Sequence, residues 1–295
     1  MRPCRSLLFV PGNRPGWMEK AADYGADCLI LDLEDSVPDR EKIAARPLVR
    51  AGIKALKAKG QSVTVRVNGF ATGLTLDDLE GVLCPELDGV FLPKIESAAD
   101  TDELDALLTH LEKRMRIPAR SISTPLLCET AKAMRNMYEI ATSCPRVRGA
   151  GLAAGPGGDA ARAIGYIWSK EGTETLFLRS KAVLDARAAG IRYPTISSWW
   201  NIKDLEGLER DARWNRQLGF RGMAVIHPSH VPVVNKVFTP SGDEIAFYQG
   251  LIQEMEEMEK KGIAAIAYKG EMVDEAMVKT AREMLEFAKS IGLQF

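Results

Sequence analysis

Eight short apolar segments recur along the chain up to residue 228, and the spacers between them have the pattern of helices. Several are nearly continuous in apolar residues, as expected for parallel strands that are covered on both faces. The segments are 6–12, 28–35, 62–69, 89–96, 123–130, 149–155, 191–197 and 222–228. Eight strand–helix alternations over about 235 residues predict an α/β fold of the (β/α)8 type, the TIM barrel, for which about 250 residues is typical. A doubly wound sheet is the alternative.

The chain continues beyond the eighth strand with residues that a barrel does not need. Residues 242–261 and 273–291 have helical patterns, and no low-complexity linker precedes them. We therefore predict a (β/α)8 catalytic domain over residues 1–240. Residues 241–295 are predicted to form a C-terminal helical extension.

The charge pattern excludes several kinds of partner. The chain has 39 basic and 40 acidic residues, a net charge of −1, and no segment in which Lys and Arg gather. We expect no nucleic-acid partner. No apolar run approaches the roughly 20 residues that span a bilayer, so we also expect no membrane partner. The five cysteines are scattered without a CxxC pair, which favours a reduced cytoplasm.

The second strand ends in three carboxylates, Asp32, Glu34 and Asp35. In a (β/α)8 barrel the chemistry occurs at the C-terminal ends of the strands. This position predicts that at least one of the three belongs to the active site. If the strand continues through them, Asp32 and Glu34 share one face and Asp35 lies on the other. The alternative is that Asp35 or Ser36 caps the next helix or turn.

Other strand ends carry Arg66, Glu129 and Asp159. Two carboxylates from neighbouring strands, without a nearby His/Cys set, would suit a hard cation such as Mg²⁺. The alternative is that Glu129 caps the next helix and Asp159 supports a turn. Arg66 could hold an anionic substrate through its planar guanidinium, or it could pair with Glu34 or Asp35.

Seven motifs in order resemble a known family. They are RSLLFVPGNRPGWMEKAADYGADCLILDLEDSV, VRVNG, LPKIES, PLLCETAKAMRN, GGDAARAIG, GFRGMAVIHPSHVPVVNKVFTPS and KGEMVDEAM. Together they resemble the citrate lyase β-subunit-like proteins of the HpcH/HpaI aldolase/citrate lyase family. The resemblance runs from residue 5 to about residue 285.

This resemblance implies a Mg²⁺-dependent carbon–carbon lyase, with Mn²⁺ as a possible substitute. Its substrate would be a β-hydroxyacyl-CoA such as citryl-, malyl- or citramalyl-CoA, cleaved to an α-keto acid and a shorter acyl-CoA. Coenzyme A is thus part of the substrate. Two alternatives stay open: an acyl-CoA thioesterase on the same scaffold, and a lyase subunit of a multi-enzyme complex that uses an acyl-carrier protein.

The resemblance also implies an assembly and a set of residue roles. Members are trimers or hexamers, so a homotrimer or hexamer is expected in which the C-terminal extension covers a neighbouring subunit's active site as a lid. The implied metal ligands are Glu129 and Asp159, with Glu129 also at the substrate. The other implied roles are Arg66 for the keto acid, Arg14 and Lys20 for the CoA phosphates, Asp274 as the acid or base of the lid, and Glu34 and Asp35 as supports for the metal's waters and Arg66.

The chain departs from the family pattern at several positions. Ala160 stands where relatives commonly have Leu, and Met223 stands where a Lys is usual. Residues 193–200 replace a segment that normally carries an Asp and a Tyr. Trp199 and Trp200 in this segment either narrow the pocket, stack on a ligand or simply pack. These changes leave the identity of the acyl group open.

Overall fold

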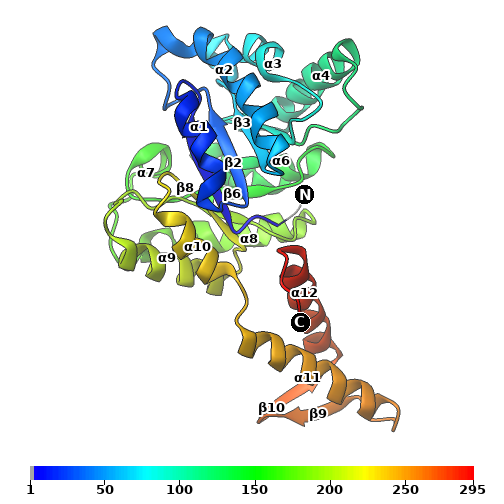
Figure 1. Cartoon of the computed structure of the whole chain (residues 1–295). Helices are drawn as coiled ribbons and strands as arrows, with labels where there is room; N and C mark the ends of the chain where they lie inside the picture. Colours follow the sequence, from blue (N-terminus) through cyan, green and yellow to red (C-terminus); the bar gives the residue numbers. More distant parts are fainter. Residues whose placement is uncertain (1–2) are drawn as a thin grey trace. The chain divides into compact units, whose positions relative to one another are not determined.

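The computed structural model describes residues 3–295, which divide into two compact units, Pro3–Phe238 and Thr239–Phe295. Figure 1 labels their helices and strands. In the first unit, short strands alternate with helices. The strands are β1 (Ser6–Pro11), β2 (Cys28–Asp32), β3 (Ser62–Arg66), β4 (Gly89–Phe91), β5 (Leu126–Cys128), β6 (Ala150–Ala153), β7 (Thr195–Ser197) and β8 (Gly222–Val225).

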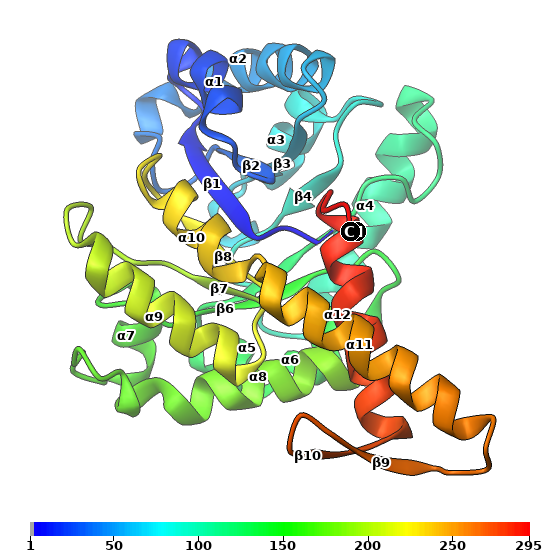
Figure 2. The same ribbon diagram turned by 60° about the horizontal axis from the view of Figure 1, so that its bottom comes forward.

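Ten α-helices connect these strands or follow them. They are α1 (Pro15–Ala21), α2 (Asp39–Ala58), α3 (Thr75–Val82), α4 (Ala98–Met115), α5 (Ala131–Arg135), α6 (Met137–Ser143), α7 (Gly158–Ile164), α8 (Leu176–Ala188), α9 (Leu205–Leu218) and α10 (His230–Phe238). Figures 1 and 2 show α1, α2, α9 and α10 outside the strands. A parallel sheet enclosed by helices is the predicted (β/α)8 arrangement.

The eight strands form one parallel sheet in the order β4-β3-β2-β1-β8-β7-β6-β5. Its two ends meet through a bridge between Gly89 and Ser123, where the Val90 N–H donates to the Ser123 carbonyl at 2.8 Å. Gly89 permits the close approach at this junction, because a Cβ there would lie 2.6 Å from Ser123 Oγ and 3.0 Å from the Ser123 carbonyl oxygen. The sheet is thus joined into a barrel, and the predicted fold is confirmed.

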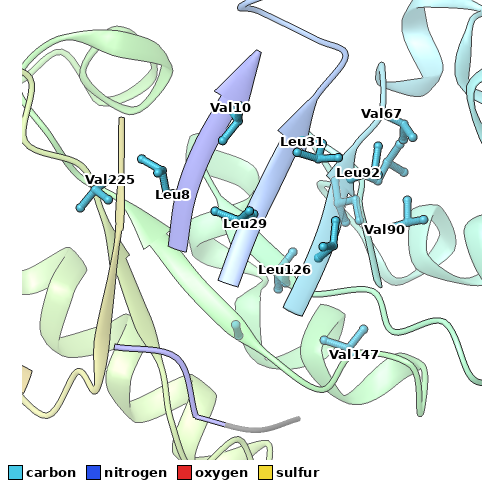
Figure 3. Packing of buried hydrophobic residues seen from close by; sticks show 14 of the residues in the cluster. Leu8, Val10, Leu29, Leu31, Val67, Val90, Leu92, Leu126, Val147 and Val225 are labelled. Atoms are coloured by element: carbon cyan, nitrogen blue, oxygen red, sulfur yellow. The ribbon is translucent and has the colours of Figure 1, made fainter. Parts of the chain in front are cut away.

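Apolar side chains on neighbouring strands build the barrel core. All five residues of β2 are buried, as the continuous apolar run predicted. Leu8 pairs with Leu29 and Val10 pairs with Leu31 across β1 and β2 (Figure 3). The same register brings Asp32 beside Arg66 at the C-terminal ends of β2 and β3. Core packing therefore fixes which polar residues meet at the mouth.

The strands end earlier than the apolar pattern predicted. The second segment was expected to be extended over 28–35, but β2 stops at Asp32 and a turn follows. The expected assignment of Asp35 to the opposite face is therefore wrong, because the alternation of faces ends with the strand. Asp35 reaches the same arginine as Asp32 and Glu34, as described below.

The second unit contains more than helices. Its helices α11 (Gly242–Glu259) and α12 (Glu275–Ser290) are separated by an antiparallel hairpin of β9 (Ala265–Tyr268) and β10 (Glu271–Asp274). The unit has its own apolar core, formed by Leu251, Met255, Val273, Val278 and Ala281. The two predicted helices are present, and the hairpin was not predicted. Among residues 3–295, no helix has both the length and the apolar character needed to cross a bilayer.

Candidate active site

A cavity of about 430 Å³ lies at the C-terminal ends of the strands in the first unit. Its polar wall includes Asp32, Asp35, Arg66, Glu129 and Asp159. These residues come from β2, β3, the loops that follow β2 and β5, and the first turn of α7, so side chains distant in the sequence face one space. The convergence expected of a barrel mouth is present.

Arg66 is held by the carboxylates that follow β2. Its Nε and Nη2 donate to the two oxygens of Asp32 at 2.6 and 2.7 Å. Its Nη1 lies 2.8 Å from Glu34 Oε2 and donates to Asp35 at 3.2 Å. A bidentate contact of this kind fixes the plane of the guanidinium. Asp32 is thus the principal partner of Arg66, a contact that the sequence analysis did not assign.

Burial and ion pairing shift the pKa values of these groups in opposite directions. Burial alone would raise the pKa of Asp32, but the hydrogen bonds and charge of Arg66 hold that pKa below its ordinary value. Burial would lower the pKa of Arg66, and Asp32 raises it instead. Glu34 differs, because burial raises its pKa despite the nearby charges of Arg66 and Lys94. Arg66 also lies over the Phe9 ring, 4.9 Å from its centroid.

Lys42 supports the loop that carries Glu34. Its buried Nζ donates to the carbonyls of Leu33 and Glu34 at 3.0 and 2.7 Å and to Asn68 Oδ1 at 2.8 Å. The loop after β2 is therefore anchored to the end of β3 from beneath. Lys42 lies in α2, and nothing in the sequence around it indicated this contact with the loop.

Lys94 connects the two sides of the mouth. Its Nζ lies 3.0 Å from Glu34 Oε1 and 3.9 Å from Asp159 Oδ2, and its backbone N–H donates to Glu129 at 2.9 Å. Its backbone has φ +56°, in the left-handed region that side-chain-bearing residues seldom adopt. The sequence placed Lys94 at a strand end but gave it no role.

Glu129 directly follows β5 and is buried at the cavity wall. Within residues 3–295, its carboxylate accepts one hydrogen bond, from the backbone N–H of Lys94. Burial raises its pKa to about 7, and the charges of Glu34 and Asp159 add to this. Thr130, and not Glu129, caps α5 by accepting from the Ala133 N–H. The capping alternative for Glu129 is therefore wrong.

Asp159 lies in the first turn of α7, and its side chain is partly exposed. Its Oδ1 accepts from Arg162, a mostly exposed residue on the same helix, at 2.6 Å. Asp159 makes no side-chain cap, because Gly157 is the N-cap residue of α7. Likewise, α2 begins after Pro38 without a side-chain cap, so neither Asp35 nor Ser36 caps it.

The pair Glu129 and Asp159 fits a hard divalent cation. Both line the same cavity, and among the described residues the buried Glu129 carboxylate forms no ion pair, although the charge of Arg66 acts on it from a greater distance. Within residues 3–295, no group of three or more His, Cys, Asp or Glu side chains is arranged to hold a metal ion. Mg²⁺ commonly takes only one or two carboxylates and completes its octahedron with water and substrate. The donor set therefore suits Mg²⁺ better than Zn²⁺.

The remaining predicted site residues lie elsewhere. Arg14 is the N-cap residue of α1 and Lys20 lies in its last turn, both exposed after the strand that contributes Pro11 to the cavity. Asp274 belongs to the second unit, where it accepts from the Ala276 and Met277 N–H groups at the start of α12. Its predicted role on a neighbouring subunit stays a prediction.

The two unusual tryptophans have different surroundings. Trp199 is buried and packs edge-on against Trp168, with 6.2 Å between the ring centroids. Trp200 is 50% exposed and lines the cavity. Of the alternatives considered for this segment, packing therefore applies to Trp199. The cavity wall contains Trp200.

This barrel, with a carboxylate pair and a paired arginine at its mouth, has the architecture of a metal-dependent (β/α)8 enzyme. Residues 5–228 match the family model for HpcH/HpaI aldolase/citrate lyase. The chain belongs to the HpcH/HpaI aldolase/citrate lyase family, which confirms the family predicted from its motifs.

Individual relatives agree over nearly the full length. The chain is 34% identical to the citrate lyase subunit beta of Leuconostoc mesenteroides subsp. cremoris, covering 97% of this chain and 93% of that protein. It is 32% identical to a (3S)-malyl-CoA thioesterase of Cereibacter sphaeroides, with 98% and 96% covered. The CitE protein of Mycobacterium tuberculosis, solved with magnesium, acetoacetate and coenzyme A, aligns with a TM-score of 0.73 at 30% identity, covering 97% and 98% of the two chains.

Proposed function

We propose that this chain is a Mg²⁺-dependent carbon–carbon lyase that cleaves a β-hydroxyacyl-CoA into an α-keto acid and a shorter acyl-CoA. The observation that carries the proposal is that Glu129, Asp159 and Arg66 line a single cavity at the mouth of the barrel. Relatives that include a citrate lyase subunit support a lyase, and the (3S)-malyl-CoA thioesterase supports a CoA ester as the substrate. The CitE complex with magnesium and coenzyme A supports the same metal and the same carrier.

Glu129 and Asp159 would hold the metal ion. Bound Mg²⁺ supplies a Lewis acid and a template that orients the keto-acid carboxylate and the oxygen beside it. Cleavage breaks the bond between the α- and β-carbons of the acyl chain. The β-hydroxyl loses its proton, and the enolate of the shorter acyl-CoA gains one at its α-carbon.

Arg66 would stabilise negative charge on the oxygen that becomes the keto group. Asp32 occupies Nε and one N–H of Nη2, while Nη1 faces Glu34 and Asp35. A guanidinium has five N–H donors, so a second Nη2 donor is left to point at the substrate. A donor whose orientation is already fixed needs no reorganisation when charge develops.

Asp274 would manage the proton at the α-carbon, delivered from the second unit of a neighbouring subunit. In such an assembly the extension would also exclude water, which separates lyase chemistry from thioester hydrolysis. We extend the proposal to a homotrimer or hexamer located in the cytoplasm. Arg14 and Lys20 would bind the CoA phosphates, and Glu34 and Asp35 would orient metal-bound water and Arg66.

Product analysis tests the proposed reaction. Purified protein incubated with malyl-, citramalyl- and citryl-CoA should release a keto acid and acetyl-CoA from at least one of them. Activity should disappear with EDTA and return with Mg²⁺ or Mn²⁺. Absence of carbon–carbon cleavage across this panel, with metal present, would refute a stand-alone lyase.

A thioesterase is the second candidate, because one relative is named a (3S)-malyl-CoA thioesterase. Release of free CoA without any keto acid would favour it. Activity that appears only with an acyl-carrier-protein thioester would favour a subunit of a multi-enzyme complex.

Two substitutions at Asp274 distinguish its proposed role as an acid or base from its role as the N-cap residue of α12. Asn is a good N-cap residue, so Asp274→Asn should preserve α12 while removing the acid or base. We expect a fall in turnover of about 10²-fold, typical of a lost general acid or base, with Mg²⁺ and keto-acid binding unchanged. Asp274→Ala should show the same loss together with reduced stability. Turnover of Asp274→Asn at the unsubstituted rate would exclude the role.

A further inference from the structure

The Trp200 ring lies against the glycine turn that precedes Asp159. A Cβ built on Gly158 would lie 2.9 Å from Trp200 Cζ2, and one on Gly157 would lie 3.4 Å from Cζ3. Both glycines have φ near +75°, which side-chain-bearing residues rarely adopt. The turn is therefore shaped to admit the indole, and the ring forms the cavity wall beside the proposed metal ligand.

Much of the cavity lining is apolar, apart from the charged residues and from Ser36, Ser197 and Ser198. Phe9, Pro11, Leu127, Ala153 and Ile226 line the cavity together with Trp200. Several of these come from β1, β5 and β6, which are rigid elements of the barrel. An apolar surface of this kind favours hydrogen or alkyl groups on the substrate and disfavours charged ones.

The charges at the mouth leave little to attract a second substrate carboxylate. Arg66 is the only Lys, Arg or His among the described residues that line the cavity. Its contacts go to Asp32, Glu34 and Asp35. Lys94 and Arg162 are not among the residues that line the cavity; Lys94 pairs with Glu34 and Asp159, and Arg162 pairs with Asp159. A second carboxylate buried here would have no cation of its own, which is costly.

We propose that Trp200 and this charge arrangement restrict the keto-acid half of the substrate to one carboxylate and a small apolar substituent, hydrogen or methyl. This inference rests on the proposed lyase function and narrows its substrate class. Malyl-CoA and citramalyl-CoA then fit the cavity. Citryl-CoA, whose keto-acid half carries a second carboxylate, does not.

The unsubstituted protein gives the first test. With Mg²⁺ saturating, kcat/KM for citramalyl- or malyl-CoA should exceed that for citryl-CoA by at least about 10²-fold, because a polar group left unpaired is strongly rejected. Calorimetry at constant free Mg²⁺ should show tighter binding of pyruvate than of oxaloacetate. Cleavage of citryl-CoA within tenfold of citramalyl-CoA overturns the inference and leaves the lyase function intact.

The same measurements distinguish failure of the proposed lyase function from failure of the proposed preference for one carboxylate. If none of the three thioesters is cleaved, the proposed function fails, and keto-acid binding still decides the inference. Pyruvate preferred to oxaloacetate then supports a monocarboxylate site. Equal or reversed affinities overturn it.

Substitution of Trp200 tests whether the indole sets the size limit. Trp200→Ala should raise the ratio of 2-oxobutyrate to pyruvate affinity by about tenfold, because the ethyl group gains space. Trp200→Phe keeps an aromatic wall and should change the ratio less. Phe177→Ala, an exposed site on α8, is the control. An unchanged ratio in Trp200→Ala, in protein whose unfolding remains cooperative, overturns the role of the indole.

Discussion

On the β2–β3 side of the barrel mouth every carboxylate contacts a cation, whereas on the β5–β6 side the buried Glu129 forms no ion pair among the described residues. On the first side, Arg66 meets Asp32, Glu34 and Asp35 within 3.2 Å. On the second, the buried Glu129 accepts one backbone hydrogen bond among the described contacts, and its pKa rises to about 7. Asp159 meets the exposed Arg162 and, at 3.9 Å, Lys94.

This difference suits the two sides to different tasks, the positioning of substrate on one side and the binding of a metal ion on the other. A paired guanidinium keeps one orientation whether or not a ligand is bound, so the β2–β3 side is suited to positioning. A buried carboxylate without a close cation is unfavourable by itself and gains most from a bound positive ion. Lys94 spans both sides, and it partly offsets the negative charge without filling the role of a divalent ion.

Removal of Arg66 should disrupt the ion pairs of the β2–β3 side and produce the largest effect. Arg66→Ala leaves the buried Asp32 without its cation and leaves Glu34 with Lys94 alone, and we expect the free energy of unfolding to fall by about 3–5 kcal/mol. Urea unfolding at pH 7 measures this. Arg210→Ala, at an exposed position on α9, should change stability by less than about 0.5 kcal/mol.

A double substitution tests the cause of that loss. In Arg66→Ala/Asp32→Asn the orphaned charge of Asp32 is absent, so part of the lost stability should return. A double variant no more stable than the single one would show that packing against Phe9, and not charge, dominates.

Neutralising Glu129 should stabilise the metal-free protein at high pH. The folded-state pKa of about 7 lies above the ordinary 4.5, so the folded protein keeps a proton that the unfolded chain releases. Stability from this group is complete below pH 4.5 and is lost as pH rises through 7. Glu129→Gln should therefore gain about 2–3 kcal/mol over the unsubstituted protein between pH 5 and pH 8.

Urea unfolding with EDTA at both pH values measures this gain, with Glu103→Gln on the exposed face of α4 as the control. Saturating Mg²⁺ should reverse the ranking at pH 8, because only the carboxylate binds it well. A pH-independent difference between Glu129→Gln and the unsubstituted protein would mean that Glu129 ionises like an exposed acid.

Loss of Asp159 should remove the metal without removing the fold. Asp159→Asn keeps the size of the side chain at a partly exposed position, so stability should change little. Turnover should fall by about 10²-fold or more, since even indirect disturbance of a metal site costs 10–100-fold. Mg²⁺ titration, product analysis and unfolding give the three readouts, and Asp102→Asn on α4 is the control. Retained Mg²⁺ affinity would remove Asp159 from the ligand set.

The barrel was predictable because parallel strands covered on both faces need continuous apolar runs, and β2 is an example. Convergence of Arg66, Glu129 and Asp159 on one cavity followed from the same topology. The apolar pattern did not predict the residue at which each strand ends. Asp35 was expected on the strand face opposite to Asp32 and Glu34, but β2 ends at Asp32, and Asp35 contacts Arg66 as they do.

Contacts between segments that are distant in the sequence were also not predictable from the sequence pattern. Lys42 supports the Glu34 loop from a helix, and Lys94 reaches two carboxylates through an unusual backbone conformation. Trp199 and Trp200 are neighbours in the chain, yet one packs on Trp168 and the other lines the cavity. The local sequence does not indicate which tryptophan packs in the interior and which lines the cavity, because residues that are distant in the sequence determine both environments.

The pH dependence of Mg²⁺ binding gives the smallest and sharpest test of the β5–β6 side. Below pH 7 a proton on Glu129 competes with the ion, because a ligand carboxyl must be ionised to bind. Affinity should therefore fall by up to about tenfold, or about 1.4 kcal/mol, for each pH unit below 7 and level off above about 7.5. Calorimetry in buffers of different ionisation enthalpy should detect about one proton released per Mg²⁺ at pH 6 and few at pH 8. Constant affinity from pH 5.5 to 8 would show that Glu129 is already ionised or does not bind the metal, and the contrast between the two sides would then depend on Asp159 alone.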